Sequence, residues 1–420
     1  MKKDLNGNKV ENQAALDHVK ALAFTRKVGT DGETKGINYI QKELEKSDID
    51  SNQESFICSS GSLMKLLLSF LFFYIILYEI FLFMNEYAWV ILILHIILIF
   101  TLIRGMSYLL DWTKIIYWGK KSKSKNVIAK LSAKNSNQKK PVAIFSAHYD
   151  TISRLYPGPF YMILMVSCLM MTLTFLFLTE ILAIWSLISI FFAPTARMVI
   201  IFQFMIYMSL ILAISIQTCV IIAIFNKSLD KSVGSLDNAT GVAILIELAK
   251  LIKKNPLEKI DVLFLWFGAE EYGLWGSRQY LAKHFDELND EYDLDKSIAI
   301  NIDIIGSYVG LMDETGLIKK KRMNERLNDI IFATAKQSNI QVKKQKAIIG
   351  TGGDHMCFKT YALKKEKSLQ VTCFASNKDA RYIHYPSDTP DRCSAKSLND
   401  CITVCHETVR SIDKRVESDF

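Results

Sequence analysis

The chain has 420 residues, a formal net charge of +8 at pH 7 and an apolar fraction of 50%. The apolar excess gathers in two blocks, and the remaining residues, about 310, have ordinary globular composition without repeats or low-complexity stretches. Two lysine-rich segments, GKKSKSK (119–125) and IKKKR (318–322), contain no aromatic residues. We therefore interpret them as solvated loops and expect no nucleic-acid partner; the first could instead touch anionic lipid.

The predicted elements begin with two amphipathic helices, at 15–23 and 37–44. The first sixty residues are polar and charged, so no signal peptide is expected there. Apolar blocks follow at 63–103, broken near Asn85 and Glu86, and at 160–225, broken at 193–197. A membrane span needs ~20 mostly apolar residues. Each block therefore predicts a helical hairpin, which gives four transmembrane helices.

Short apolar runs predict buried strands: VAIFS before His148, IDVLFLWF before Glu270 and IAINI before Asp303. Helical spacing of apolar residues recurs at 242–252, 324–335 and 398–412. This alternation predicts an α/β fold with a mostly parallel mixed sheet sandwiched by helices. We expect residues 1–61, 105–158 and 226–420 to form one domain, into which hairpins at 62–104 and 159–225 are inserted.

Five acidic and imidazole side chains carry the chemistry: His148, Asp237, Glu271, Asp303 and His384. Each lies in or just beyond an apolar run or a Gly-punctuated turn, so they are expected at the carboxyl ends of strands, where α/β sheets place their sites. Imidazole and carboxylate are zinc ligands, and a shared carboxylate allows a pair of ions ~3.5–4 Å apart. The pattern predicts a metal-dependent hydrolase.

Each motif also has a simpler interpretation. His148 with Asp150 gives a zinc ligand and a carboxylate for its other ring N–H, although a strand-end histidine can be satisfied by backbone alone. Asp237 lies in a turn before a helix, where helix capping is the alternative.

Glu270 and Glu271 would repel each other in a bare pocket. Bound dications would let one carboxylate bind metal while the other transfers a proton, whereas the alternative is a solvated acidic turn. His355 rivals His384 as the last ligand, and Asp388, four residues after His384, could orient its ring.

Six motifs occur in order along the chain and resemble the co-catalytic zinc aminopeptidases of metallopeptidase family 28. They are AHYDT (147–151), SLDNATG (235–241), FGAEEYGLWGS (267–277), NIDIIGS (301–307), GGDHMCF (352–358) and HYPSDT (384–389). Residues 17–46 also resemble the amino-terminal helices of that family. The resemblance implies two zinc ions, Asp237 as bridging ligand, Glu270 as general base, Glu271 as a ligand and His384 rather than His355 as the last ligand. Asp303 would then share the ion of His148.

The implied function is a membrane-embedded zinc aminopeptidase that hydrolyses amino-terminal residues from peptides. One alternative is a glutaminyl-peptide cyclotransferase, which uses a single zinc on a similar scaffold. The other is a non-catalytic receptor or scaffold with the same fold, which would usually have lost ligands or the base. Side-chain preference is expected to depend on loops such as 343–353 and 374–381. The sequence leaves the oligomeric state open.

The flanking charges predict the orientation in the membrane. Positive residues near the helix ends lie mostly on the side of the globular domain: Lys65, Arg104, Lys114, Arg154, Lys227 and Lys231. The opposite loops hold only Arg197, so the catalytic domain and both termini are expected in the cytoplasm. The eight cysteines form no regular framework, which favours reduced thiols. A lumenal domain with disulfides is the alternative.

Two further expectations concern the hairpins. Glu79 and His95 are predicted at similar depth in the first hairpin, where they could pair or simply face the bundle. The second hairpin leaves and rejoins the chain close to Asp150 and Asp237, so the catalytic mouth is expected near the bilayer surface.

Overall fold

A computed structural model describes residues 13–84, 90–135, 139–156, 158–315, 321–346 and 352–415. The chain divides into two compact units. We call the first the sheet unit; it comprises Met1–Ser60, Trp112–Ser153 and Leu229–Phe420. We call the second the helix unit; it comprises Gly61–Asp111 and Arg154–Ser228.

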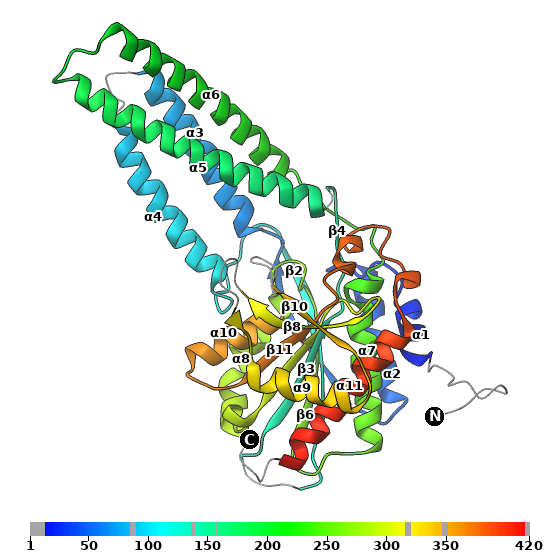
Figure 1. The fold of residues 1–420 in the computed structure, drawn as a ribbon. Helices are drawn as coiled ribbons and strands as arrows, with labels where there is room; N and C mark the ends of the chain where they lie inside the picture. Colours follow the sequence, from blue (N-terminus) through cyan, green and yellow to red (C-terminus); the bar gives the residue numbers. More distant parts are fainter. Residues whose placement is uncertain are drawn as a thin grey trace. The chain divides into compact units, whose positions relative to one another are not determined.

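The sheet unit is built on a nine-stranded mixed sheet in the order β1-β2-β6-β3-β7-β11-β8-β10, with β9 paired to β8 (Figure 1). Strands β6, β3, β7 and β11 are parallel neighbours, whereas β1 and β2 run antiparallel at one edge. Its strands are β1 (Ser51–Ser59), β2 (Lys121–Leu131), β3 (Val142–His148), β6 (Asp261–Phe267), β7 (Ile298–Ile302), β8 (Val309–Thr315), β9 (Lys321–Arg322), β10 (Val342–Lys346) and β11 (Gln370–Phe374). The short strands β4 (Ser153–Arg154) and β5 (Ser228–Leu229) form a separate ladder.

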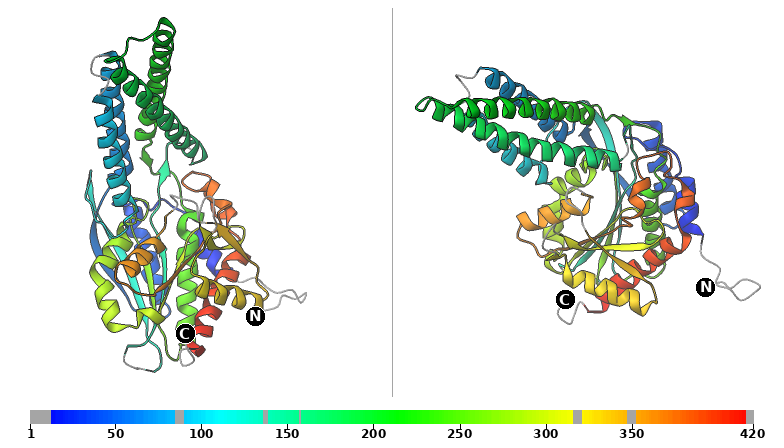
Figure 2. Two further views of the ribbon diagram at one scale, coloured as in Figure 1. Left: turned by 60° about the vertical axis from the view of Figure 1, so that its left-hand side comes forward. Right: turned by 45° about the horizontal axis from the view of Figure 1, so that its top comes forward.

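Helices cover both faces of this sheet (Figure 2). One face, with Phe145 and Trp266 in its core, packs against α1 (Ala14–Ala21), α2 (Asp31–Glu45), α7 (Thr240–Lys254), α9 (Glu325–Gln337) and α11 (Ala395–Arg415). The other face, with Ile144 and Leu265, packs against α8 (Trp275–Glu291) and α10 (His355–Lys364). Successive side chains of a strand point to opposite faces, which is why β3 and β6 are apolar throughout. The predicted α/β fold is confirmed.

One local prediction was wrong. The lysine-rich segment 119–125 was expected to be a loop, but Lys121 to Lys125 open strand β2 and pair along β1. In this part of the strand Ser124 is buried, whereas Lys121 and Lys123 are exposed. The residues on both faces are polar, so the sequence lacks the alternation of apolar and polar residues that predicts a strand. Residues 318–320 of the second lysine-rich segment lie outside the described residues.

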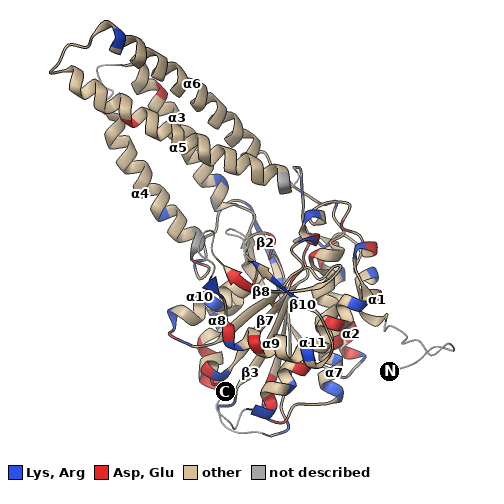
Figure 3. Cartoon of the chain, in the orientation of Figure 1, with Lys and Arg blue, Asp and Glu red and all other residues tan. Residues whose placement is uncertain are grey.

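The helix unit holds α3 (Leu63–Phe83), α4 (Val90–Leu110), α5 (Gly158–Ser189) and α6 (Ala196–Ile224). All four helices are long and apolar enough to cross a membrane, and few charged residues interrupt them (Figure 3). Ser62 and Thr195 cap α3 and α6 by accepting hydrogen bonds from Lys65 N and Met198 N. At ~1.5 Å per residue, α3 and α4 are each about 31 Å long, close to the ~30 Å hydrocarbon core of a bilayer.

The polar side chains inside this unit connect the two hairpins. Gln217 on α6 donates to Glu79 on α3 at 2.9 Å, and His95 on α4 lies 3.3 Å from Glu180 on α5. The suggested Glu79–His95 pair is therefore replaced by partners from the other hairpin. The prediction rested on the similar depth of Glu79 and His95 in the hairpin, but residues at the same depth on two helices can point in different directions.

Candidate metal centre

The structure brings all five predicted ligands together at the carboxyl ends of the central strands. His148 is the last residue of β3, Asp303 follows β7, and Glu271 lies in the turn between β6 and α8. Asp237 lies in the irregular segment Ser235–Ala239 before α7, and His384 lies in the loop that precedes α11. After β3 the chain forms β6 on one side of β3 and then β7 on the other side, so the site occupies a topological switch point.

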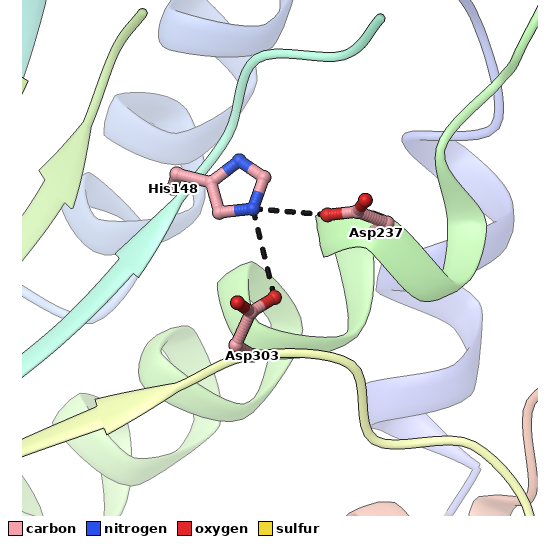
Figure 4. A group of neighbouring side chains, drawn as sticks. All are labelled: His148, Asp237 and Asp303. Atoms are coloured by element: carbon pink, nitrogen blue, oxygen red, sulfur yellow. Dashed lines mark ion pairs between the residues drawn. The ribbon is translucent and has the colours of Figure 1, made fainter. Parts of the chain in front are cut away.

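Two overlapping groups of possible metal ligands share Asp237. In the first, His148 Nε2 lies 3.0 Å from Asp237 Oδ1 and 3.6 Å from Asp303 Oδ1 (Figure 4). In the second, His384 Nε2 lies 3.0 Å from Asp237 Oδ2 and 2.8 Å from Glu271 Oε1. Within each group the ligand atoms lie within 4.8 Å of one another. Asp237 therefore directs one carboxylate oxygen to each group.

The donor set fits zinc in both chemistry and charge. It consists of imidazole nitrogens and carboxylate oxygens, and Asp303 Oδ1 is buried with no hydrogen-bond partner among the described residues. Burial opposes a charge on His148, yet Glu270 and the contacts to Asp150, Asp237 and Asp303 raise the pKa of its ring well above the usual value. Burial likewise opposes a charge on Asp237, but both histidines lower the pKa of this carboxyl. Such an excess of carboxylates around two imidazoles is suited to a bound cation.

Asp150 connects the first group to the acidic turn. Its Oδ1 lies 3.6 Å from His148 Nδ1, which is longer than a hydrogen bond. Its carboxylate accepts hydrogen bonds from the backbone N–H groups of Glu270 and Glu271, at 3.0 and 3.2 Å. Asp150 therefore fixes the turn that carries both glutamates and also faces the imidazole of His148. The sequence had predicted only that Asp150 faces the imidazole.

Glu270 lies beside these groups without belonging to either of them. Burial raises the pKa of its carboxyl well above the usual value; His148 opposes the shift, and Glu271, Asp354 and Asp303 add to it. A carboxyl with a raised pKa can both accept and release a proton near neutral pH.

Asp388 has a different role from the expected one. It was predicted to orient the His384 ring, but its Oδ1 accepts from Leu236 N at 2.5 Å and its Oδ2 from Asp237 N at 3.3 Å. The carboxylate thus holds the backbone of the turn that presents Asp237. The short spacing to His384 was misleading, because φ at His384 is +65° and the chain changes direction there.

Arg26 is a site-supporting residue that sequence reasoning missed. Its side chain is 0% exposed and donates to backbone carbonyls on both sides of the site: Leu22, Phe24, Tyr149, Val233 and Gly234. Burial lowers the pKa of Arg26 to about 10 against the pull of Asp388, Asp150 and Asp237, so the guanidinium stays charged at neutral pH. A single arginine outside any motif carries no sequence signal for this role.

His355, the rival ligand, belongs to neither group of the described residues. Burial lowers the pKa of its ring to about 4. The preceding Asp354 is fully buried, and burial raises the pKa of its carboxyl to about 7, although His148 opposes this shift. Of the loops expected to set side-chain preference, 374–381 is described, whereas 347–351 lie outside the described residues.

Comparisons with known proteins agree with this geometry. Residues 223–409 match the model of peptidase family M28. A 76-residue stretch is 34% identical to aminopeptidase YwaD of Bacillus subtilis (strain 168), covering 18% of this chain and only 16% of that protein. The fold is similar to that of BSAP, a zinc aminopeptidase from Bacillus subtilis, with a TM-score of 0.52, 13% identity and coverage of 95% and 94% of the two chains.

It is equally similar to a glutaminyl cyclase from Fimbriiglobus ruber, with a TM-score of 0.52, 14% identity and coverage of 98% and 97%. At these identities the solved structures establish the fold alone. The matched segment 223–409 includes Asp237, Glu270, Glu271, Asp303 and His384. Through this segment, the chain is similar to peptidase family M28.

Proposed function

We propose that the protein is a zinc-dependent aminopeptidase with two metal ions. The observation that carries this proposal is the sharing of Asp237 between two ligand groups, with one carboxylate oxygen facing His148 and the other facing His384. Asp303 completes the first group and Glu271 the second. Zinc ions held there would polarise the scissile carbonyl and acidify the attacking water.

The residues of the chain supply the remaining chemistry. Glu270 accepts the proton of the attacking water and delivers it to the leaving amine, for which its raised pKa is suited. Asp150 keeps Glu270 in place through the backbone N–H of that residue. Asp388 and Arg26 hold the turn that carries Asp237.

The test is the release of free amino acids from peptides with unblocked and blocked amino termini. We expect hydrolysis of unblocked peptides only, and we expect Glu270→Gln to abolish turnover while keeping the bound zinc, because only proton transfer is lost. An active Glu270→Gln enzyme would refute the role of this residue.

A glutaminyl cyclase is the second candidate, favoured by the similarity of the fold to the Fimbriiglobus ruber enzyme. A cyclase would release ammonia from peptides with amino-terminal glutamine, whereas an aminopeptidase would release glutamine itself. Ammonia without free amino acid would decide for the cyclase.

We further propose that α3, α4, α5 and α6 cross a membrane, with the sheet unit and both termini in the cytoplasm. The helices have the length and composition for four spans, and the flanking lysines and arginines favour this orientation. The test is an introduced cysteine at the exposed Thr195. In intact cells it should react with an impermeant maleimide, whereas a carboxyl-terminal reporter should indicate the cytoplasm; the reverse pattern would contradict the orientation.

A further inference from the structure

Four exposed apolar residues of the sheet unit form one patch. Within the described part of this unit, the large apolar side chains that remain exposed are Ile57 (45%), Ile116 (42%), Tyr117 (43%), Trp118 (52%) and Leu363 (77%). Three of them are consecutive, and Ile57 adjoins the same segment through Gln279; Leu363 lies on α10 and is not counted with them. A set of exposed apolar side chains gathered in one place indicates an interaction surface rather than scattered surface residues. We call it the aromatic patch.

A ring stack and hydrogen bonds connect the patch to α8 and β1. The Tyr117 ring stacks on Trp275, with ring centroids 5.0 Å apart. The Gln279 amide donates both to Tyr117 Oη at 2.8 Å and to the carbonyl of Ile57 at 3.2 Å. Trp118 N donates to Ser59 Oγ at 3.0 Å. The side chains of the patch therefore stay exposed although their backbone is anchored.

The same α8 and α10 surfaces fix the start of this segment. The Arg278 guanidinium lies 5.0 Å from the centre of the Trp112 ring. Lys364, which follows Leu363, donates to Thr113 Oγ1 at 2.6 Å. This contact brings the end of α10 beside Thr113, five residues before Trp118.

Lysines surround the patch. Lys114, Lys120, Lys121 and Lys364 are all exposed. The Lys121 ammonium lies 5.1 Å from the centre of the Tyr117 ring. Exposed tryptophan and tyrosine residues near lysines are typical of protein surfaces that contact the headgroup region of a bilayer. The positive charge would add attraction to anionic lipid.

The position of the patch in the chain points to the same partner. Its residues flank both ends of the first apolar hairpin, because α3 begins at Leu63 and α4 ends at Leu110. At no more than ~3.6 Å per residue, Trp118 lies within about 29 Å of the end of α4 by chain length. The β1–β2 ladder pairs Ser59 with Lys121, which closes the two ends on each other.

We propose that the aromatic patch contacts the interface of an anionic bilayer and holds the sheet unit on its surface. Trp275, on which Tyr117 stacks, begins α8 directly after the acidic turn, and its N–H donates to the carbonyl of Ala269 at 3.1 Å. Through Trp275, the patch is thus connected to the turn that carries Glu270. If the proposed peptidase function holds, its substrates include peptides whose amino termini lie at the membrane surface.

The test uses the full-length protein in vesicles of phosphatidylcholine, with or without an equal amount of phosphatidylglycerol. Trp118→Cys carries a polarity-sensitive fluorophore, and Lys254→Cys, exposed at the far end of α7, is the matched control. The protein without an introduced cysteine corrects for labelling of the native thiols. Shallow lipid-attached nitroxides should quench the label at 118 several-fold more than the label at 254, and phosphatidylglycerol should increase the difference.

Equal quenching at the two positions, or no effect of phosphatidylglycerol, would overturn the proposal and leave a protein partner as the occupant of the patch. Neutralising Lys114, Lys120 and Lys121 to Gln should remove the effect of the anionic lipid. This fluorescence readout does not depend on catalysis, so it remains informative if the peptidase function fails.

A double variant tests the consequence for substrates. Ile116→Ser with Trp118→Ser should leave hydrolysis of a small soluble peptide unchanged and slow hydrolysis of an acylated peptide in anionic vesicles several-fold. An unchanged ratio of the two rates would refute the proposed link between the patch and substrate access.

Discussion

At the scale of single residues, the site depends on how Asp237 is held. Its two oxygens face two histidines, and each would lose its partner if the carboxylate turned. Asp388 prevents this rotation indirectly, since its carboxylate accepts the backbone N–H groups of Leu236 and Asp237. Hydrogen bonds behind the ligands therefore set the ligand geometry, as is usual at metal sites.

Asp388→Asn tests this support. An asparagine side chain has one acceptor oxygen where the carboxylate has two, so it cannot accept both N–H groups in the same way. We expect zinc affinity to fall by roughly 10–100-fold, measured by competition with a chelator. Asp391→Asn is the control, because the Asp391 side chain is 71% exposed and lies on the same loop. Equal affinity in the Asp388 and Asp391 variants would contradict the support role.

We expect a second carboxylate, Asp313, to make stability depend on pH. It is 0% exposed and accepts from Arg322 at 3.1 Å, Asn328 at 3.0 Å and Lys344 at 3.1 Å. Burial alone would raise the pKa of its carboxyl, but these partners outweigh burial and lower it. Because the folded-state pKa lies below the unfolded value of ~3.9, the stabilisation is present above about pH 4 and is lost as the pH falls further.

Asp313→Asn should therefore lower the thermal unfolding temperature at neutral pH, and the difference from the native protein should shrink as the pH drops below about 4. The control is Asp286→Asn, whose side chain is 73% exposed and pairs with Lys365. A difference that stays constant with pH would contradict this account of Asp313.

At the scale of elements, the sequence predicted β3, β6, β7 and several of the helices, but not the central strand β11, the helices α8 and α10, or the edge strands. β3, β6 and β7 are buried on both faces and therefore read as continuous apolar runs. β2 and β10 contain several lysines and are recognisable only through their pairing with neighbours distant in sequence. The contacts of Arg26 and Asp388 were missed for the same reason, because both join segments far apart in the chain.

The contact between α7 and β7 places Asp237 near Asp303. A Cβ atom on Gly241 would lie 2.5 Å from the carbonyl oxygen of Ile302 and 2.6 Å from Asn238 Oδ1. In an open helix Gly→Ala would stabilise by up to ~1 kcal/mol. Here we expect the collision to dominate and Gly241→Ala to destabilise the fold by about 1–3 kcal/mol, measured by thermal or denaturant unfolding.

Gly158→Ala is the matched control, since a Cβ atom there would meet nothing within 4 Å. It should be neutral or slightly stabilising. Equal stability of the two alanine variants would show that the close approach of α7 to β7 is unimportant.

At the scale of the whole molecule, one catalytic sheet unit is interrupted twice by apolar hairpins. The chain leaves the sheet unit after Ser153, five residues past His148, and returns at Leu229, eight residues before Asp237. Two residues of the first ligand group are thus separated in sequence by the second hairpin and meet only in the folded chain. Family resemblance made this pairing predictable, whereas sequence periodicity alone left the ligand roles open.

We propose that Asp237 serves two ions at once. The zinc content per chain of the purified full-length protein, measured by plasma mass spectrometry after removal of loosely bound metal, tests this proposal. We expect close to two zinc ions per chain. We also expect Asp237→Ala to lose both, because each ligand group then lacks a member. One zinc ion per chain in the native protein would contradict it.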